Sequence, residues 1–440
     1  MIPKKSAVRA AAMPFALATV LMASAACGSG SASGGSEGGS GTPAPPSSGH
    51  SSAAGTAINV GVLAPFSGVL AGSGPPIKES VNLWLDENNN SIAGHPVNLF
   101  VADDKSTVDG EVSAARSLVE QHHVSIVVGL VNSAGALAVR DYLTKSKVLA
   151  MDVIANTDAL LSPEKGPYLF VMPPTPKQTA SAAAVLASTL NYKSIDVVAD
   201  NFAGARSWVD PLVDRFKEQN GSVVSSQFPP FPTSDYGPYI SRIQSSGDKA
   251  DAVVALMYGG DALAFLKQYK SFGADLPLYS VGAMLEPTST FLPAAKGTAK
   301  GMYTYWNYSP ALPGGTNSKF TQLYQDRLQR VPGAFDMQAY TALDFLTAAY
   351  KAAGDENPTT EQLAKALTTV KVDSAVGQVS FNAQHGIDWN MYLMKVGQGS
   401  DGVEQMLPQG PFVSGANAQQ SAADAKSNLR QLPATASSSQ

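Results

Sequence analysis

Short apolar runs alternate with helical stretches along the chain from Ile58 onward. The apolar run that ends at Gly129 lacks the polar alternation of a half-exposed strand, which is typical of a strand buried on both faces of a parallel sheet. Parallel strands joined by helices of ordinary length form right-handed βαβ units. The sequence therefore predicts an α/β fold. We expect its strands at residues 58–64, 97–102, 124–129, 147–153, 168–172, 195–199, 222–227, 251–257 and 278–281.

The proline-rich stretch Pro173–Pro176 divides this alternation into two series, because no helix continues through it. Each series predicts one doubly wound, Rossmann-like lobe, with a hinge and a ligand cleft between the two lobes. The later part of the chain predicts helices at residues 317–330, 336–353 and 359–370, and late strands at 377–381 and 391–396 that pair with each other. We assign residues 58–172 and 305–358 to the first lobe and residues 173–304 and 359–413 to the second.

The first 26 residues have the pattern of a secretory signal. Lys4, Lys5 and Arg9 precede an apolar stretch that is too short to span a bilayer, and small residues follow it. Cys27 is the only cysteine of the chain, so no internal disulfide can form. Its position resembles the lipid-modified cysteine of bacterial lipoproteins, although Ser24 stands where a leucine is usual. The alternative is an ordinary signal followed by a free thiol.

Residues 27–57 consist almost entirely of small residues and proline, a composition that cannot form a core and predicts a flexible tether. A chain of this length and composition reaches about 30 Å, which gives a lipid anchor at Cys27 a purpose. Residues 414–440 are rich in alanine, serine and glutamine, and we expect them to be disordered. The body of the protein is then residues 58–413.

The charge balance excludes several classes of partner. The formal net charge of −5 becomes −8 once the signal is removed, because the signal carries three cations and no acid. Without a basic run, the body is a poor candidate for binding nucleic acid or anionic lipid directly. No apolar stretch of about 18 residues follows Cys27, so we expect no membrane span.

Polar and aromatic side chains follow the expected strands at the edge where such sheets bind ligands. Asn132 and Ser133 open a helix, whose free amides suit an anion such as a carboxylate; the alternative is that Ser133 only caps the helix. Aromatic residues such as Phe66 and Tyr258 either line a pocket or pack in the core. The candidate ligand-binding residues at these strand ends are Phe66, Asn132, Ser133, Asn156, Thr157, Phe202, Tyr258, Asp261, Met284 and Glu286.

Motifs for catalysis, cofactors and metals are absent from the sequence. No glycine-flanked serine stands between an expected strand and helix, as a nucleophile elbow requires, and no phosphate loop with lysine occurs. The five histidines lie in the tether, in turns or at a helix end. Residues 103–111 superficially resemble a calcium loop, but Lys105 and Val108 stand where a ligand and a glycine are required. We therefore expect no enzyme activity, no cofactor and no metal.

Several stretches in order carry a family resemblance. They include Ile58–Val62 with Ser67-Gly68, the Asp103-Asp104 turn, Val127–Gly129 with Asn132-Ser133, Asp261-Ala262 with Phe265–Gln268, and Tyr340. From residue 58 to about 412 the chain resembles the periplasmic-type solute-binding proteins of ABC transporters in the branched-chain amino acid group. The resemblance implies a two-lobed protein that closes on a small molecule, delivers it to a membrane permease and catalyses nothing.

The resemblance also implies roles for individual residues. The carboxylate-binding serine of the family falls on Ser133, and a second hydroxyl position falls on Asn156 or Thr157. A ligand-contacting tyrosine falls near Phe202. The acid that holds the ammonium of an amino acid falls on Met284, with Glu286 two residues later. If Glu286 does not reach the ligand, a carboxylate or aromatic acid without an amine is as good a candidate as an amino acid.

Sequence alone therefore predicts a monomeric, lipid-anchored, extracytoplasmic protein that binds a carboxylate-bearing solute and docks on an ABC permease. The alternatives are a ligand-sensing receptor, which would use the same cleft, and an enzyme, for which no nucleophile and base are found.

Overall fold

The computed structural model describes residues 55–399, 402–413 and 429–430. The expected signal segment, Cys27 and nearly all of the tether lie outside the described residues, as does most of the expected tail. In the described part of the chain, no helix has the length and apolar character that a bilayer crossing requires. The described residues belong to one compact unit.

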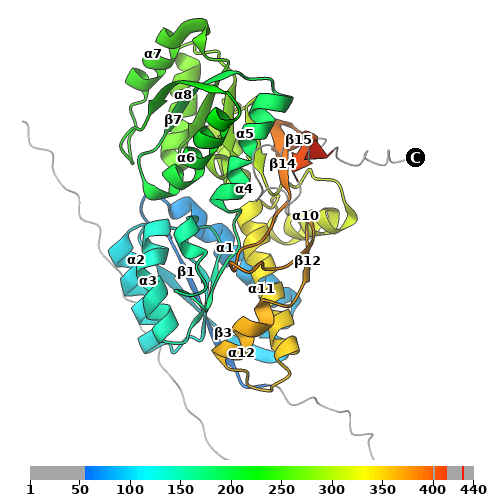
Figure 1. The fold of residues 1–440 in the computed structure, drawn as a ribbon. Coiled ribbons are helices and arrows are strands. Elements are labelled where there is room, and N and C mark those ends of the chain that lie inside the picture. The colour runs from blue at the N-terminus through cyan, green and yellow to red at the C-terminus, as the bar shows by residue number, and fades with distance from the viewer. Residues whose placement is uncertain (1–54, 400–401, 414–428, 431–440) are drawn as a thin grey trace, which may run out of the picture. The chain divides into compact units, whose positions relative to one another are not determined.

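The first sheet has the order β2-β3-β1-β4-β5-β6. All its neighbours pair in parallel except the short β2, which is antiparallel to β3. Figure 1 labels helices α1 (Gly74–Glu87), α2 (Val108–Arg116) and α3 (Ser133–Lys145) beside this sheet. Its strands are β1 (Ile58–Ala64), β2 (Ser91–Ile92), β3 (His95–Asp103), β4 (Ile126–Gly129), β5 (Leu149–Asp152) and β6 (Leu169–Val171).

The second sheet repeats this winding and adds antiparallel strands at one edge. Its order is β16-β15-β14-β11-β10-β9-β7-β8, so the five parallel strands β8-β7-β9-β10-β11 match β3-β1-β4-β5-β6 of the first sheet. Both are doubly wound α/β sheets, which confirms the predicted fold class. The strands are β7 (Ser194–Ala199), β8 (Ser222–Gln227), β9 (Ala252–Leu256), β10 (Leu278–Val281), β11 (Tyr303–Trp306), β14 (Met391–Gln398), β15 (Glu404–Val413) and β16 (Leu429–Arg430).

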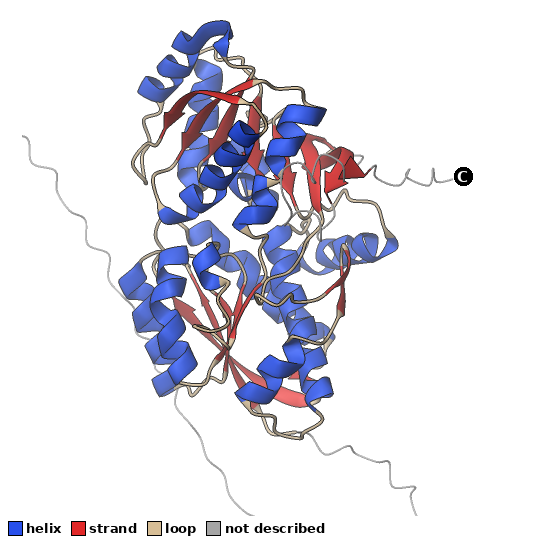
Figure 2. Cartoon of the chain, viewed as in Figure 1, coloured by secondary structure: helices blue, strands red, loops and turns tan. Residues whose placement is uncertain are grey.

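The remaining elements cover these sheets, and Figure 2 separates them from the strands by colour. The core between the helices and the sheets contains large apolar side chains, among them Trp84, Phe216 and Phe265. The helices of the second series are α4 (Pro176–Ala180), α5 (Ala182–Ala184), α6 (Ala203–Glu218), α7 (Gly237–Ser246), α8 (Gly259–Ser271) and α9 (Thr288–Ala295). They are followed by α10 (Gly315–Leu328), α11 (Ala334–Ala353), α12 (Thr360–Leu367) and the hairpin of β12 (Val372–Ser374) and β13 (Gly377–Val379).

The lobe boundaries differ from those we expected. Tyr305 and Trp306 belong to β11 in the second sheet, whereas we placed them in the first lobe. Helix α12 contacts α11 and β5 on the side of the first sheet, where Thr360 donates to the carbonyl of Lys147, although we assigned it to the second lobe. The apolar face of α12 finds a partner only in the tertiary structure, so its sequence pattern does not say which lobe it covers.

Late strand pairing also differs from the expectation. β13 pairs with β12, while β14 pairs with β11 and β15. Within the tail that we expected to be disordered, Leu429–Arg430 forms β16 and pairs antiparallel with Val413 and its neighbour in β15. The open edge of β15 offers unpaired backbone groups, which is what a further strand requires.

Two of the segments that connect the sheets run side by side. The main-chain N–H of Val171 donates to the carbonyl of His385 at 2.8 Å, and the His385 ring stacks on Phe170 with centroids 4.2 Å apart. Trp389 is buried and donates its ring N–H to the carbonyl of Met172 at 2.5 Å. The two segments therefore support each other where the chain passes between the sheets.

A buried ion network holds α10 and α11 against α1. The guanidinium of Arg330 donates to both carboxylate oxygens of Asp336 at 2.7 and 2.8 Å and to Glu79 on α1 at 2.7 Å. Asp336 is almost completely buried and also accepts from Ser80 and from the amide of Gly333. Such a carboxylate is costly without its cation.

Replacing Arg330 with Met should lower the free energy of unfolding by about 3 kcal/mol, because the buried Asp336 loses its counter-charge. The matched control is Arg327→Met, since Arg327 pairs with the exposed Asp86 and Glu87 and should cost less than about 1 kcal/mol. Urea unfolding measures both. Equal losses for the two variants would contradict this account.

Candidate functional site

Each sheet has one pair of neighbouring strands from which the chain continues in opposite directions. Proteins of this fold class bind ligands at the carboxyl ends of that pair. In the first sheet the pair is β1 and β4, and in the second it is β7 and β9. The segments that leave these strands carry Phe66, Asn132 and Ser133 in the first case, and Phe202, Tyr258 and Asp261 in the second. Topology thus brings six of the candidate residues to two equivalent positions.

Ser133 is buried at the start of α3 and joins two strand-end loops. Its hydroxyl donates to the carbonyl of Asn156 and accepts from the amide of Asn156, both at 3.0 Å. Asn132 is the N-cap of α3, and its side chain accepts from the amide of Ala134 at 3.1 Å. Thr157 caps the short 3₁₀ turn that follows, at residues 158–160. Ser133 therefore fixes the loop after β5 against the start of α3.

Phe66 lies in a loop that Asp103 organises. One oxygen of Asp103 accepts from the amides of Phe66 at 2.9 Å and Lys105 at 2.8 Å. Its other oxygen accepts from the hydroxyl of Ser67 at 2.6 Å. Asp103 is thereby the acceptor for the turn that carries Phe66.

Aromatic side chains group at the carboxyl end of the second sheet. The half-buried ring of Phe202 stacks on Phe231, with centroids 4.5 Å apart and planes at 25°. Tyr258 meets Phe202 edge to face, with centroids 5.3 Å apart. All three residues are half-buried, and their rings form one aromatic group at this end of the sheet.

Two acids beneath these rings bind the protein's own donors. Asp261 accepts from the amide of Thr233 at 2.6 Å and from the hydroxyl of Tyr236 at 3.3 Å. Asp200 accepts from the same hydroxyl at 2.8 Å and from the amide of Tyr258 at 3.0 Å. Burial raises the pKa of Asp200 to about 7, although these hydrogen bonds oppose the shift.

Met284 and Glu286 are both buried, in different ways. Met284 is fully buried in a 3₁₀ turn, and its sulfur accepts from the hydroxyl of Ser280 at 3.3 Å. The two oxygens of Glu286 accept from the amides of Thr288 and Ala334, each at 2.9 Å. These amides begin α9 and α11 and have no carbonyl partner within their own helices. Burial raises the pKa of Glu286 to about 7 despite the two amide donors.

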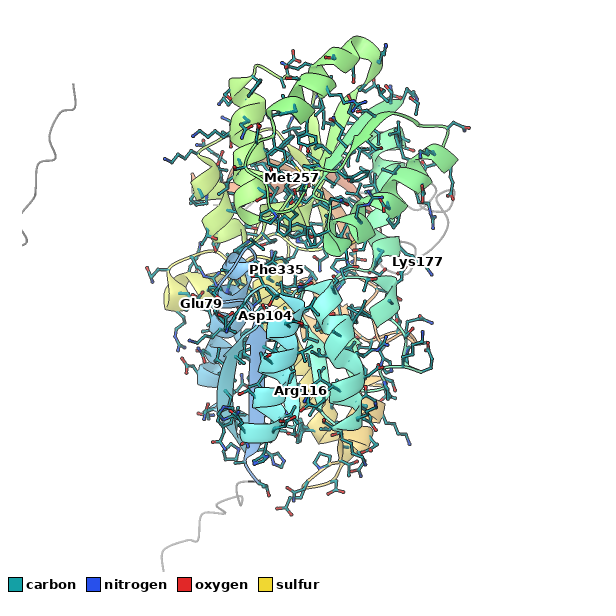
Figure 3. The ribbon with its side chains drawn as sticks, turned by 90° about the vertical axis from the view of Figure 1, so that its left-hand side faces the viewer. Glu79, Asp104, Arg116, Lys177, Met257 and Phe335 are labelled. Carbon is teal, nitrogen blue, oxygen red and sulfur yellow. The ribbon has the colours of Figure 1, made fainter. Side chains whose placement is uncertain are left out.

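Loops from the two sheets contact each other near these residues. The hydroxyl of Ser207 on α6 donates to the carbonyl of Asn156 at 2.8 Å, the same carbonyl that Ser133 contacts. Helices α3 and α6 also contact each other. Figure 3 labels Phe335, in the first turn of α11, between the parts of the ribbon that carry the two sheets. Ser133 and Ser207, which belong to helices of different sheets, thus meet at the carbonyl of Asn156.

Several buried polar atoms of the protein have no hydrogen-bond partner among the described residues. They include both side-chain polar atoms of Asn307, which follows β11, and both of Gln338 on α11. The indole N–H of Trp306 and the side-chain oxygen of Asn156 are likewise unpaired. Buried polar groups are nearly always satisfied, so such atoms indicate contacts with water or a ligand.

Ser207, Phe231, Asn307 and Gln338 are not among the candidates that we chose from the sequence. Asn307 follows a strand end, so the rule that selected the other candidates could have found it. Ser207 and Gln338 lie within helices, where nothing in the sequence distinguishes a buried polar side chain from an exposed one. Phe231 lies in a loop and reaches the site only by stacking on Phe202.

Comparison with known proteins identifies the family of the chain. A family model described as "Periplasmic binding protein" matches residues 57–402. Among curated relatives, the Leu/Ile/Val-binding protein homolog 6 of Brucella melitensis is 26% identical over 357 residues, which cover 78% of this chain and 89% of the relative.

Solved structures agree as well. An ABC transporter substrate-binding protein from Sphaerobacter thermophilus has a TM-score of 0.74 at 27% identity, covering 81% of this chain and 98% of that one. A solute-binding protein of an R. palustris ABC transporter, in complex with 4-hydroxybenzoate, has a TM-score of 0.72 at 26% identity, covering 80% and 98%. The chain therefore belongs to the periplasmic binding protein family, and it is an extracytoplasmic solute-binding protein rather than an enzyme.

Proposed function

We propose that this protein captures a small aromatic or related organic acid that lacks an amine, and passes it to an ABC permease. The observation that carries the proposal is the hydrogen bonding of Glu286. Both of its oxygens accept from helix-terminal amides, and Met284 stands at the position that the family resemblance gives to an ammonium-binding acid. An amino acid would then bring a buried ammonium group to a site without a free acid, which is strongly unfavourable.

The other acids at these strand ends are also engaged. Asp200 and Asp261 bind amides and the hydroxyl of Tyr236, and Asp103 binds the turn that carries Phe66. Each of these carboxylates accepts hydrogen bonds from donors of the protein itself. A ligand without a cationic group places no demand on them.

Two further features suit an aromatic acid. The first turn of α3 supplies amides for a carboxylate, as helix starts do generally. The rings of Phe202, Phe231 and Tyr258 offer stacking and edge contacts to a flat ligand. The unpaired amide groups of Asn307 and Gln338 are available for a second polar group, such as a ring hydroxyl.

The related proteins include both kinds of binder by name. The R. palustris structure contains 4-hydroxybenzoate, whereas the Brucella relative is called a Leu/Ile/Val-binding protein homolog. An amino acid is therefore the second candidate ligand, and it requires Glu286 to give up at least one of its amide donors. Sensing of the same ligand for signalling is compatible with the same site.

We also propose that Cys27 carries a lipid and that the segment up to residue 57 tethers a monomeric body to the membrane. The support is the sequence pattern of a charged start, a short apolar stretch and small residues before the only cysteine. Cys27→Ala should move the protein from the membrane fraction to the soluble extracytoplasmic fraction. Retention of the variant on the membrane would contradict the lipid anchor.

The ligand class can be tested by thermal shift, because a ligand that binds only the folded state raises the melting temperature. We expect 4-hydroxybenzoate or benzoate to raise it and leucine to leave it unchanged. Benzamide, which has the ring without the carboxylate, is the matched control and should give no shift. A shift with leucine alone would overturn the aromatic-acid assignment in favour of the second candidate.

Gln338→Met should stabilise the free protein and weaken ligand binding. The fully buried Gln338 has two unpaired polar atoms, and removing them from an apolar environment gains about 1–2 kcal/mol in the free energy of unfolding. Exposed Gln322 on α10 is the control, and Gln322→Met should change stability by less than about 0.5 kcal/mol. A destabilised Gln338→Met with normal ligand affinity would contradict a role for Gln338 in binding.

A further inference from the structure

Three fully buried carboxyl groups lie near one another at the carboxyl end of the first sheet, and one of them lies against the start of α3. Asp104 follows β3, Glu111 is on α2, and Asp152 ends β5. An oxygen of Glu111 occupies the space that a side chain on Gly135 would fill, so this carboxyl group lies directly against the start of α3. Neighbouring carboxyl groups also act on one another here, Asp104 on Glu111 and Glu111 on Asp152.

Hydrogen bonds satisfy only two of the six carboxyl oxygens of this acid cluster. One oxygen of Asp104 accepts from the amide of Ser106 at 2.6 Å. One oxygen of Asp152 accepts from the amides of Ile154 and Ala155, at 3.1 and 2.8 Å. The second oxygen of each, and both oxygens of Glu111, have no donor among the described residues.

No cation compensates these groups in the described part of the chain. None of the ion pairs there includes Asp104, Glu111 or Asp152, and the described acids, histidines and cysteines form no group that could hold a metal ion. Arg116 lies at the other end of α2, as Figure 3 shows, and pairs with Glu120. Several unpaired charges in so small a buried space are not sustainable.

A proton is the simplest group that supplies the missing donor. Two carboxyl groups that share a proton satisfy an acceptor and remove a charge at once. Burial, and then the nearby Asp104, raise the pKa of Glu111 to about 9. Burial raises the pKa of Asp104 to about 6, with Asp103 adding to the shift, and raises that of Asp152 well above its usual range with Glu111 adding.

We propose that Glu111 holds a proton, shared with a neighbouring carboxylate of Asp104 or Asp152, that removes the negative charge of Glu111 from the start of α3 and thereby leaves these amides able to bind a carboxylate. The proton makes ligand binding dependent on pH. The inference rests on the proposed function only in requiring a carboxylate ligand. It holds equally for an aromatic acid and for an amino acid.

The first test is the pH dependence of stability. A carboxyl group with a raised pKa in the folded state binds a proton that the unfolded state has lost, so its contribution is complete below pH 4.5 and declines as pH rises to about 9. Between pH 6 and 9 the melting temperature should fall by roughly 2 °C per pH unit more in the wild type than in Glu111→Gln. Asp109→Asn, which removes an exposed acid from the same helix, should keep the wild-type slope. Equal slopes for the wild type and Glu111→Gln would overturn the proposal.

A second measurement detects the proton directly and needs no variant if Glu111→Gln fails to fold. At a pH of about 8.5, Glu286 and Asp200, whose pKa values are about 7, are ionised. The infrared spectrum in heavy water should still show the carbonyl band of a protonated carboxyl group, and the band should disappear as the pH passes about 10. Absence of the band at pH 8.5 would contradict a shared proton.

The link to the ligand is tested by affinity, with whichever of 4-hydroxybenzoate and leucine binds in the thermal-shift screen. Raising the pH from 7 to 10 should weaken binding by the wild type tenfold or more, because ionised Glu111 repels the ligand carboxylate. Glu111→Gln should lose most of this dependence. An identical pH dependence in the two proteins would overturn the link, whereas a shift with neither ligand would count against the proposed function itself.

Discussion

Backbone amides at helix starts must find acceptors, and this requirement decides which polar side chains of the protein are left for a ligand. Glu286 serves the starts of α9 and α11, Asn132 serves α3, and Asp103 serves the turn that carries Phe66. A carboxylate committed in this way is withdrawn from ligand binding. The acids near the site therefore stabilise the fold and do not bind the ligand. The groups left available are amides, rings and neutral side chains, which suit an uncharged or anionic solute.

The doubly wound sheets were predictable because buried parallel strands are continuous apolar runs and helices separate them. The positions of Ser133, Phe202 and Tyr258 followed from the same rule, since strand ends meet at one edge of each sheet. The sequence does not determine which hydrogen bonds and contacts these side chains make. Whether Ser133 meets Asn156 or a ligand depends on a loop 23 residues away, and no local pattern encodes that contact.

The lobe assignment failed for a related reason. Helix α12 and the β12–β13 hairpin lie on the side of the first sheet, although in the chain they stand between β11 and β14 of the second sheet. An amphipathic helix shows that it covers something, while the identity of the covered surface depends on contacts such as that between Thr360 and Lys147. The unpaired polar atoms of Gln338 escaped prediction likewise, because burial of a glutamine is a property of the assembled fold.

Glu286 also bears on how fast a solute can enter. It belongs to the segment after β10, but one of its hydrogen bonds goes to α11, which packs against α1 and so moves with the first sheet. Any opening that separates these segments breaks a charge-assisted bond and leaves an amide of α11 exposed to water. The strength of this single bond then helps to set the fraction of time the protein spends open, and with it the rate of solute capture at low external concentration.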